Sequence, residues 1–565
     1  MPTLLYFLLG GALVSCMLFV VTERQFLEAL CNNWRWLGLI LLVTLLWRLP
    51  FDGHWFFGLE YEDSYIYSVS ARYVNSGTIM CSPGNSCYLT TVCAVGNQNS
   101  CRLSETSSGH FLGYPLVIAI ASRVFGYSPA MAARLSLTAS MATVVLIFLS
   151  GKLIGGETAG LAASVIFGLT PVFAVQGVGA YAEPVSNMLV VACFLLCVRL
   201  VNSDADSTRA LLVNWLALTF TAVLAVAVKR ENVLLVPVIT LTGLMFNVDT
   251  RNRAQGKRWL VNLAALLSGG ICIVFAVVQL RIVTVVRREM LEYAVFPFNA
   301  AVLRTMLPLF LKSYSSVSWY LGGGILVLLG LIASMRAKRR GVYAVGALIA
   351  YLLLYASHVR SYYQLQSGDV TQFDTLRYSM NIAGLWSILA GLGFAFSAET
   401  LAKWRFGAWL RRRPGRVILW LFVGAYIVSS WVLMNRWKED MVSTELAVRI
   451  EPAEAALEQV DDLGAKNTFV ITLEPLLVQM FCREPVNVIA FPYLSGSLVQ
   501  DVRRSSPDAT FLYVEQAIYR SETYRERYRA AFDFLDGLQK ERLSGGKNYA
   551  IYRINMPEGA QVEQH

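Results

Sequence analysis

Long apolar runs separated by short polar loops fill most of the first 435 residues. About twelve of these runs have roughly the 17–22 residues that a helix needs to cross a hydrocarbon core ~30 Å thick. Because nothing in that core can bond an exposed peptide group, each run is predicted to be a helix. The first run follows no basic segment, so it is predicted to be a span and not a secretory signal. The predicted spans are residues 3–21, 35–50, 130–151, 157–177, 184–201, 210–228, 231–248, 259–280, 320–335, 341–357, 378–397 and 417–435.

Loops rich in arginine and lysine set the predicted orientation, because such loops remain on the cytoplasmic side. The strongest are residues 251–258, 336–340 and 403–416, and an even number of spans separates each neighbouring pair. Both chain termini are then extracytoplasmic. The same side is predicted for residues 51–129, 178–183, 281–319, 358–377 and the tail after Asn435.

A shorter apolar segment, residues 111–121, does not fit this count. It is too short to cross the bilayer, and Pro115 interrupts it. Counting it as a span would place the acidic residues before and after it on opposite sides of the membrane. It is therefore predicted to be an interfacial or re-entrant helix within the first large extracytoplasmic loop, residues 51–129.

The pattern changes after residue 435, where polar residues separate short apolar stretches. Residues 467–472, 508–514 and 549–554 have the composition of buried strands. Residues 451–460 and 521–540 have the composition of helices. Residues 436–565 are therefore predicted to form an extracytoplasmic α/β domain, large enough for its own core, beside a transmembrane domain of residues 1–435.

Composition agrees with a membrane protein. The chain is 56% hydrophobic and 15% charged, whereas soluble proteins are about 25% charged. The net charge of +10 does not indicate a nucleic-acid partner, because most basic residues lie in the short loops that set orientation. The predicted fold class is a mainly α, polytopic membrane helix bundle with about twelve transmembrane helices, followed by the α/β domain.

Four cysteines crowd one polar stretch of the first large loop, namely Cys81, Cys87, Cys93 and Cys101. A zinc site would favour paired Cys-x-x-Cys spacings, which are missing, and the nearest histidine is His110. Two disulfides are the preferred prediction if the loop lies in an oxidising compartment. Four cysteines allow three pairings, and the spacing does not choose among them.

Acidic residues mark the two places where chemistry is expected. Glu60, Glu62 and Asp63 follow the second span, and Glu183 stands alone before the fifth span on the same predicted side. Carboxylates beside hydrocarbon are costly and often functional. A solvated loop and a helix N-terminal charge are the alternative interpretations. Together the residues suggest a general base with a supporting carboxylate, with a divalent cation as a candidate cofactor at Glu62, Asp63 and Glu183.

Basic residues on that same side could hold a phosphate, since arginine binds it bidentately and lysine binds it as a point charge. Lys229 and Arg230 join two spans there, against the usual charge bias of loops. Ion pairing with Glu231 or Asp374 is the competing explanation for any one of them. The other candidates on this side are His358, Arg360, Arg377 and Tyr378.

At these residues the sequence resembles the GT-C glycosyltransferases, which include bacterial arabinosyltransferases, the lipid A aminoarabinose transferase and protein O-mannosyltransferases. The stretch Glu62-Asp63-Ser64-Tyr65-Ile66-Tyr67, with Ala71-Arg72-Tyr73 after it, is similar to the acidic signature of their first extracytoplasmic loop. Four later motifs follow in the family's order: Gly113-Tyr114-Pro115-Leu116, Tyr181-Ala182-Glu183-Pro184, Lys229-Arg230-Glu231-Asn232 and Arg377-Tyr378. The set covers roughly residues 35–397.

The resemblance implies inverting transfer of a hexosyl or pentosyl group from a polyprenyl-phosphate carrier to a hydroxyl of a glycan, lipid or protein acceptor. Glu62 or Asp63 would be the base, and Glu183 would orient the acceptor, the base or a metal. The substrate-binding residues would be Glu60, Tyr65, His110, Tyr114, Lys229, Arg230, His358, Arg360, Arg377 and Tyr378. The implied location is the bacterial inner membrane, in contact with membrane lipids and with no nucleic acid.

The sequence departs from the family in three places. Glu62 stands where aspartate is usual, the four-cysteine insert is not a general feature, and the Trp-Trp-Asp-Tyr-Gly motif of oligosaccharyltransferases is missing. A transporter or flippase of a lipid-linked or anionic substrate is the main alternative, because charges at membrane depth also build substrate pathways. An O-antigen-type polymerase or ligase and a non-enzymatic scaffold are weaker alternatives.

Overall fold

The structure is a computed structural model. It describes residues 24–49, 67, 68, 71, 113–202, 208–249, 255–283, 300, 303, 304, 307, 308, 321, 323–336, 346, 347, 349–351, 353, 354, 372–403, 421–433, 435, 450–464, 467–472, 475–482, 486–491, 494, 496–517 and 522–555.

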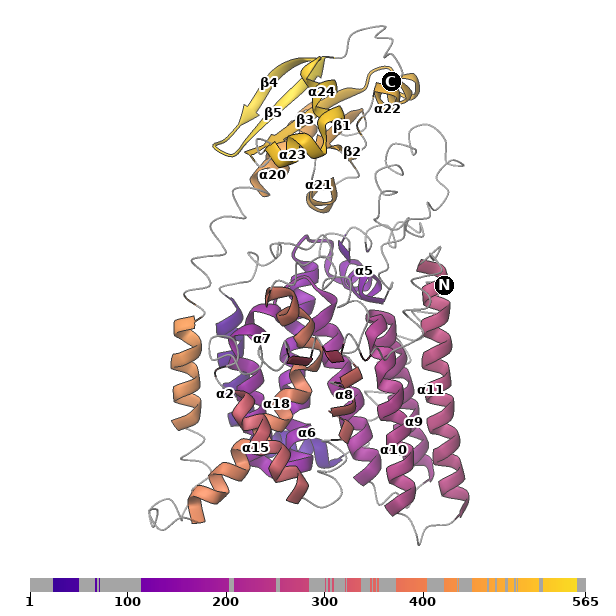
Figure 1. Ribbon diagram of the computed structural model, residues 1–565, viewed down its shortest axis with the longest axis vertical. Coiled ribbons are helices and arrows are strands. Elements are labelled where there is room, and N and C mark those ends of the chain that lie inside the picture. Colours follow the sequence, from indigo (N-terminus) through magenta and orange to yellow (C-terminus); the bar gives the residue numbers. More distant parts are fainter. Residues whose placement is uncertain are drawn as a thin grey trace.

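Apolar helices form a bundle in the lower part of Figure 1. Six of the described helices are long and apolar enough to cross a membrane: α2 (Arg24–Arg48), α6 (Met131–Leu169), α8 (Ala182–Asn202), α9 (Thr208–Val228), α11 (Gln255–Val283) and α18 (Gln372–Lys403). Shorter apolar helices are α5 (Gly113–Phe125), α10 (Leu235–Asp249), α15 (Gly323–Arg336) and Leu421–Leu433. The chain is therefore a membrane protein. The first predicted span, residues 3–21, lies outside the described residues, so the count of twelve stays a prediction.

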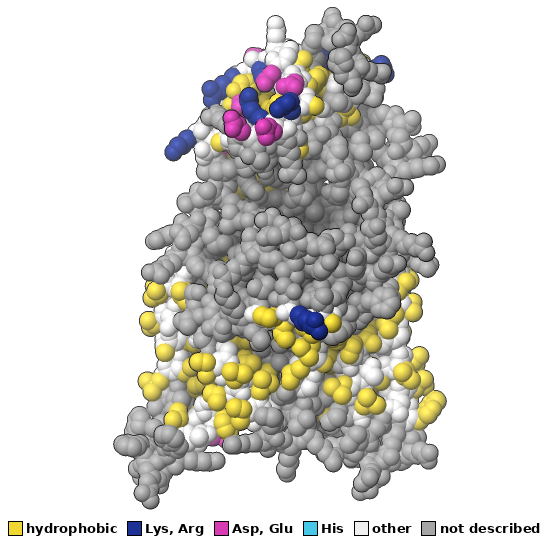
Figure 2. Space-filling model, viewed as in Figure 1, with side chains coloured by type: hydrophobic (Ala, Val, Ile, Leu, Met, Phe, Trp, Pro, Cys, Tyr) yellow, Lys and Arg dark blue, Asp and Glu magenta, His cyan; other side chains and the backbone are white. Residues whose placement is uncertain are grey.

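Many apolar side chains of the bundle face outward. Figure 2 shows them spread over the lower part of the molecule. Leu266 of α11 and Leu421 of the Leu421–Leu433 helix are both 70% exposed. In water such a surface would be costly, whereas in a bilayer it contacts lipid chains. The exposed apolar surface agrees with the membrane assignment.

Helix α6 is a hairpin of two arms that correspond to the predicted spans 130–151 and 157–177. Its backbone breaks at Gly156, whose φ of 85° is open to glycine at little cost. The arms then pack closely, because a Cβ on Gly151 would lie 2.8 Å from Gly160 Cα. Ser164 Oγ also donates across the arms to Val144 O at 3.0 Å. Small residues thus allow close helix packing, as is common in membranes.

The second arm of α6 leads into the short helix α7 (Pro171–Gln176) and a turn that is buried throughout, residues 170–182. Arg48, at the end of α2, binds carbonyl groups at the end of α6 and in α7. Its Nη1 donates to Gly168 O at 2.6 Å and its Nη2 to Phe173 O at 3.3 Å. The guanidinium therefore meets the carbonyl end of a helix, where the helix dipole favours positive charge.

Helix α5, Gly113–Phe125, covers residues 113–121 of the predicted short segment and is not counted among the long spans, whereas residues 111 and 112 lie outside the described residues. Pro115 lies in its first turn, where proline is tolerated because the missing N–H has no helical acceptor. The end of the helix leaves Val124 69% and Phe125 80% exposed. Exposed apolar residues at the end of a short helix suit a position at the membrane interface.

The C-terminal part of the chain folds around a five-stranded sheet with strand order β2-β1-β3-β5-β4. Strands β1, β2 and β3 are parallel, whereas β5 is antiparallel to both β3 and β4. We call residues 450–555 the C-terminal α/β region. Its elements are α20 (Glu451–Leu463), β1 (Thr468–Thr472), α21 (Pro475–Phe481), β2 (Asn487–Ala490), α22 (Gly496–Ser505), β3 (Thr510–Gln516), α23 (Glu522–Arg527), α24 (Arg529–Asp536), β4 (Gln539–Gly545) and β5 (Tyr549–Asn555).

Strands β1, β3 and β5 lie where the sequence predicts them. Both faces of the sheet are covered, so β1 is buried at every position and reads as a continuous apolar run. The predicted helix 521–540 is wrong at its end, because α24 stops at Asp536 and residues 539–545 form β4. Strand β4 lies at the sheet edge with mostly solvated side chains, so it lacks the apolar alternation of a buried strand. The short strand β2, at the other edge, is also missing from the sequence-based prediction.

The C-terminal α/β region contacts the bundle at the turn between α5 and α6. Tyr127 Oη donates to Met480 O of α21 at 2.9 Å. Ala133 of α6 belongs to the apolar cluster that includes Ile450 and Cys482. Figure 1 shows α5 at the end of the bundle nearest to this region. The region therefore lies at the same end of the bundle as α5.

Candidate functional site

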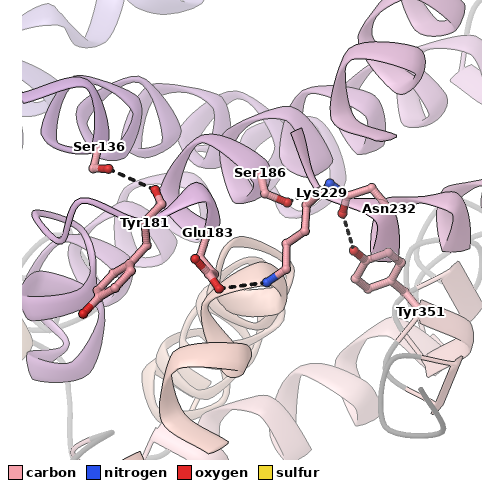
Figure 3. A network of polar contacts seen from close by, with 7 residues as sticks. All are labelled: Ser136, Tyr181, Glu183, Ser186, Lys229, Asn232 and Tyr351. Carbon is pink, nitrogen blue, oxygen red and sulfur yellow. Dashed lines mark hydrogen bonds and ion pairs between the residues drawn. The ribbon is translucent and has the colours of Figure 1, made fainter. Parts of the chain in front are cut away.

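Glu183 and Lys229 form a buried ion pair at the start of α8. Lys229 Nζ lies 3.0 Å from Glu183 Oε1, and the two side chains are 6% and 3% exposed. Figure 3 shows them pointing toward each other from different elements. Removing either partner would leave a charge in a medium that stabilises it poorly, which is why buried charges occur in pairs. The structure thus joins two residues that the sequence analysis singled out separately.

The local backbone explains where each charge lies. Glu183 is in the first turn of α8, where the helix dipole favours a carboxylate. Lys229 follows α9 in an extended conformation, with φ −147° and ψ 123°, before the 3₁₀ helix η3 (Arg230–Leu234). This break between two helical segments directs the Lys229 side chain toward α8.

Asn232 makes a second link between η3 and α8. Its Nδ2 donates to Ser186 Oγ at 2.7 Å and to Ala225 O at 2.8 Å. Its Oδ1 accepts from Tyr351 Oη at 3.1 Å. Ser186 is three residues after Glu183, so both links reach the same face of α8. Because Asn232 and Ser186 are fully buried, these bonds hold η3 against α8 without competition from water.

Tyr114 connects the second motif to the segment before Glu183. Its Oη lies 3.1 Å from both Ala132 O and Ser136 Oγ. Ser136 Oγ in turn donates to Tyr181 O at 3.2 Å. Tyr67, from the first motif, packs edge-on against the Tyr114 ring with centroids 5.0 Å apart. The first, second and third motifs therefore meet in space.

Gly113 packs against the backbone before Lys229. A Cβ at this position would collide with Ala227 C and O and would lie 2.6 Å from Val228 N. Only glycine allows α5 to approach α9 so closely. The second motif therefore touches the fourth motif as well. Gly113 contacts the backbone just before Lys229, and Tyr114 is linked through Ser136 to the backbone just before Glu183.

The remaining predicted site residues are not placed. Seven lie outside the described residues: Glu60, Glu62, Asp63, Tyr65, His110, His358 and Arg360. The backbone places Arg230 in η3 and Arg377 and Tyr378 in α18, but their side chains are not described. The predicted disulfide residues Cys81, Cys87, Cys93 and Cys101 are also outside.

A metal site is not tested by the described residues. They contain no group of three His, Cys, Asp or Glu side chains that could hold an ion. Glu62 and Asp63, the candidate ligands beside Glu183, are not among them. Within the described part of the chain, the cation next to Glu183 is the Lys229 ammonium.

Several polar residues of the site were not predicted from the sequence. Ser136, Ser186 and Tyr351 each bond a motif residue or a residue next to one. Asn187 accepts from the backbone N–H of Gly384 at 3.1 Å, which joins α8 to α18. A polar run at helical spacing on α8, formed by Glu183, Ser186 and Asn187, is the signal that could have indicated this face.

Comparison with known proteins identifies the fold. Scans against protein-family models and curated proteins give no significant match. Among solved structures, ArnT from Cupriavidus metallidurans bound to undecaprenyl phosphate is 12% identical over 92% of this chain and 98% of ArnT, with a TM-score of 0.57. The archaeal oligosaccharyltransferase AglB from Archaeoglobus fulgidus, in complex with an inhibitory peptide and a dolichol-phosphate, is 11% identical over 94% of this chain and 75% of AglB, with a TM-score of 0.50.

The fold is that of the GT-C glycosyltransferases. At such low identities the likeness concerns the fold, and residue roles need their own support. In this GT-C fold, the described parts of the four motifs from Tyr67 to Asn232 converge at one end of the helix bundle. The Trp-Trp-Asp-Tyr-Gly motif of oligosaccharyltransferases is missing from the sequence, so the likeness to AglB does not extend to that motif.

Proposed function

We propose that this protein is an inverting glycosyltransferase that moves a sugar from a polyprenyl-phosphate carrier to a hydroxyl of an extracytoplasmic glycan, lipid or protein. The observation that carries the proposal is the buried Lys229–Glu183 pair, with Nζ and Oε1 3.0 Å apart, where the sequence motifs converge. The GT-C fold supports it. ArnT with bound undecaprenyl phosphate and AglB with bound dolichol-phosphate show that this fold accommodates polyprenyl phosphates.

Lys229 is the described residue best suited to the donor phosphate. Its ammonium carries three hydrogen-bond donors, and it donates to Glu183 Oε1 at 3.0 Å. Burial keeps water away, so an added anion would interact strongly with the charge. Arg230, in the next position, would supply a second cation. The pair is thus a preformed site for an anionic group, with Glu183 orienting the lysine side chain.

The chemistry needs a base as well as a cation. A carboxylate from Glu62 or Asp63 removes the proton of the acceptor hydroxyl, whose oxygen forms a bond to the anomeric carbon. The bond from that carbon to the phosphate oxygen breaks, and its electron pair leaves with the polyprenyl phosphate. Lys229 offsets the negative charge that remains on the phosphate. Attack opposite the leaving group inverts the anomeric configuration.

The same proposal covers the domains and their location. Residues 1–435 form the transmembrane catalytic domain in the bacterial inner membrane, and residues 436–565 form the α/β domain outside it. The contact between Tyr127 and Met480 supports a position of the α/β domain at the end that holds the ion pair. Acceptors would then reach the site from the extracytoplasmic face, beside the α/β domain.

Donor cleavage tests the proposal. Purified protein in lipid nanodiscs is incubated with a panel of undecaprenyl-phosphate hexoses and pentoses carrying a radiolabelled sugar. Transfer to added acceptor glycans or release of the sugar to water is followed by chromatography. We expect one donor to be consumed, and the product sugar to carry the inverted anomeric configuration by NMR.

Variants test whether the site around Lys229 and Glu183 is responsible for donor cleavage. Lys229→Met should reduce donor cleavage by about 10²-fold, the usual cost of losing one group that stabilises a developing anion. Lys540→Met removes a lysine from an exposed ion pair with Asp536 and should leave cleavage unchanged. Binding of every donor without cleavage of any would contradict the proposal and support a transporter or flippase.

A further inference from the structure

Helix α5 contacts the chain on both sides of the ion pair. At its N-terminus, Gly113 lies against the backbone of Ala227 and Val228, directly before Lys229. One residue later, Tyr114 reaches Ser136, which holds the Tyr181 carbonyl two residues before Glu183. The separation between the Lys229 and Glu183 backbones therefore depends on where α5 lies.

The hydroxyl contacts from Tyr114 to Tyr181 form a directed chain. Ser136 has one proton, and Tyr181 O accepts it. Tyr114 Oη must then donate its own proton toward Ser136 Oγ and Ala132 O, both at 3.1 Å. Tyr114, Ser136 and Tyr181 are all nearly or fully buried. Such a buried polar chain is rigid when every member is bonded.

Ser140 extends this support by one helical turn. Ser140 is four residues after Ser136, and its Oγ donates to Gly177 O at 2.9 Å, as Ser136 Oγ donates to Tyr181 O. The two serines share a face of α6 and hold two carbonyls of the same buried turn. Without these donors both carbonyls would lose a partner in a place that water reaches poorly. The turn that carries Glu183 is therefore fixed to the first arm of α6.

The other end of α5 is bound by the C-terminal α/β region. Tyr127, two residues after α5, donates to Met480 O at 2.9 Å. Ala130 and Ala133, in the same turn and the start of α6, pack with the apolar cluster of α20 and α21. A shift of the C-terminal α/β region would act on the turn between α5 and α6, and therefore on both of these helices.

We propose that the C-terminal α/β region sets the geometry of the Lys229–Glu183 pair through α5, with Tyr127, Tyr114 and Ser136 as positioning residues. One consequence rests on the proposed function: an acceptor or partner bound to the C-terminal α/β region would control the rate of donor cleavage. The coupling itself is a structural property of the chain. An acceptor or partner that moves α21 would change the ion pair at a distance through this path.

Hydrogen–deuterium exchange of the full chain in nanodiscs tests the coupling without any substrate. The variants are Tyr127→Phe and Ser136→Ala, and the peptides followed cover residues 177–186. We expect both variants to raise exchange in these peptides several-fold over wild type. Ser136→Thr, which keeps the hydroxyl, should restore exchange toward the wild-type rate.

Two matched controls separate coupling from general loosening. Thr138→Ala removes an exposed hydroxyl of the same helix that bonds only Arg134 O, and Tyr552→Phe removes a hydroxyl of β5 while keeping its ring against Tyr513. Neither should change exchange in residues 177–186. Unchanged exchange in these peptides in Tyr127→Phe or in Ser136→Ala would overturn the proposal, as would equal acceleration in either control.

The outcome is independent of the proposed function. Exchange reports the coupling whether or not the protein cleaves a sugar donor. If wild type cleaves a donor, Tyr127→Phe and Ser136→Ala should lower kcat several-fold, with Ser136→Thr recovering it. Faster exchange in a protein that cleaves no donor would leave the coupling in place and refute only the transferase.

Discussion

Asn232 lies against Ser186, with 2.7 Å between Nδ2 and Oγ, beside the ion pair of Lys229 with Glu183. The two contacts together fix η3 to the first turns of α8. The ion pair places the Lys229 ammonium at the start of α8, and the Asn232 amide fixes the orientation of η3. A buried lysine with a single neighbour would have several rotamers, whereas η3 held at two points limits them. The site is therefore rigid before any ligand binds, which favours catalysis of charge-separating reactions.

Breaking the ion pair should destabilise the protein more than removing it whole. Lys229→Met or Glu183→Leu leaves the buried partner uncompensated, at a cost of about 3–5 kcal/mol when a charge remains unpaired. Lys229→Met with Glu183→Leu removes both charges and should be markedly more stable than Lys229→Met alone. Thermal unfolding of the four proteins in one detergent measures the difference. Additive losses in the double variant would show that the pair is not energetically coupled.

The contact of α5 with α9 should tolerate no side chain. Gly113→Ala forces a methyl group into the backbone of Ala227 and Val228, and overpacking of this kind costs about 1–3 kcal/mol. Gly270→Ala on α11 is the matched control, because nothing lies within 4 Å of its added Cβ. The melting temperature and the rate of donor cleavage should both fall in Gly113→Ala and remain at the wild-type values in Gly270→Ala. Wild-type behaviour of Gly113→Ala would mean that α5 and α9 do not pack in direct backbone contact.

The Asn232 side chain should stabilise the protein through its hydrogen bonds and not only through the volume that it fills. Asn232→Leu removes two donated bonds and the acceptor for Tyr351, leaving buried Ser186 and Tyr351 hydroxyls with fewer partners. Unsatisfied buried groups cost about 1–3 kcal/mol each. Tyr351→Phe removes only one of these bonds and should be milder. Thermal unfolding of both variants checks this, and an equal loss of stability in the two would contradict the expected ranking.

The C-terminal α/β region should lose stability as pH rises past the carboxyl range. Partial burial, together with the negative charges of Glu458 and Glu451, raises the pKa of Glu454 above its ordinary value. Protonation is then easier in the folded state, so the contribution of Glu454 to stability is full below the ordinary pKa and is lost as pH rises through the raised pKa. Glu454→Gln should therefore raise the melting temperature of this region at pH 7, with the gain disappearing at acid pH.

Glu526→Gln, on the exposed helix α23, is the matched control for that change. In Glu526→Gln, the change in melting temperature between pH 4 and pH 7 should be close to the change in wild type. A gain for Glu454→Gln that is the same at both pH values would exclude charge repulsion as its cause.

Hydropathy indicated the six long apolar helices that the structure describes, and the reason is physical. Every peptide group in the bilayer must bond within its own helix, so apolar length alone indicates a span. The α6 hairpin follows the two predicted runs, with Gly156 at the break between them. Strands β2 and β4 escaped prediction because edge strands are short or solvated and lack a clear apolar pattern.

Charge counting predicted that Glu183 and Lys229 share one side of the membrane, and the structure joins them directly. Their pairing could not be predicted, because it depends on how α8 and α9 are rotated about their axes. Ser136 could not be selected either, since a serine that bonds a neighbouring helix looks the same in sequence as one that bonds its own helix. The order of the helices is thus readable from the sequence, whereas the contacts between their side chains are not.

The most direct test of the central claim is steady-state cleavage of the preferred undecaprenyl-phosphate sugar by wild type, Lys229→Met and Lys540→Met in nanodiscs. If the buried Lys229 ammonium stabilises the departing phosphate, kcat/KM should fall by about 10²-fold in Lys229→Met and should not change in Lys540→Met. Each rate is divided by the folded fraction of that protein, measured by thermal unfolding, so that only folded protein is compared. Equal kcat/KM for folded Lys229→Met and wild type would contradict the account.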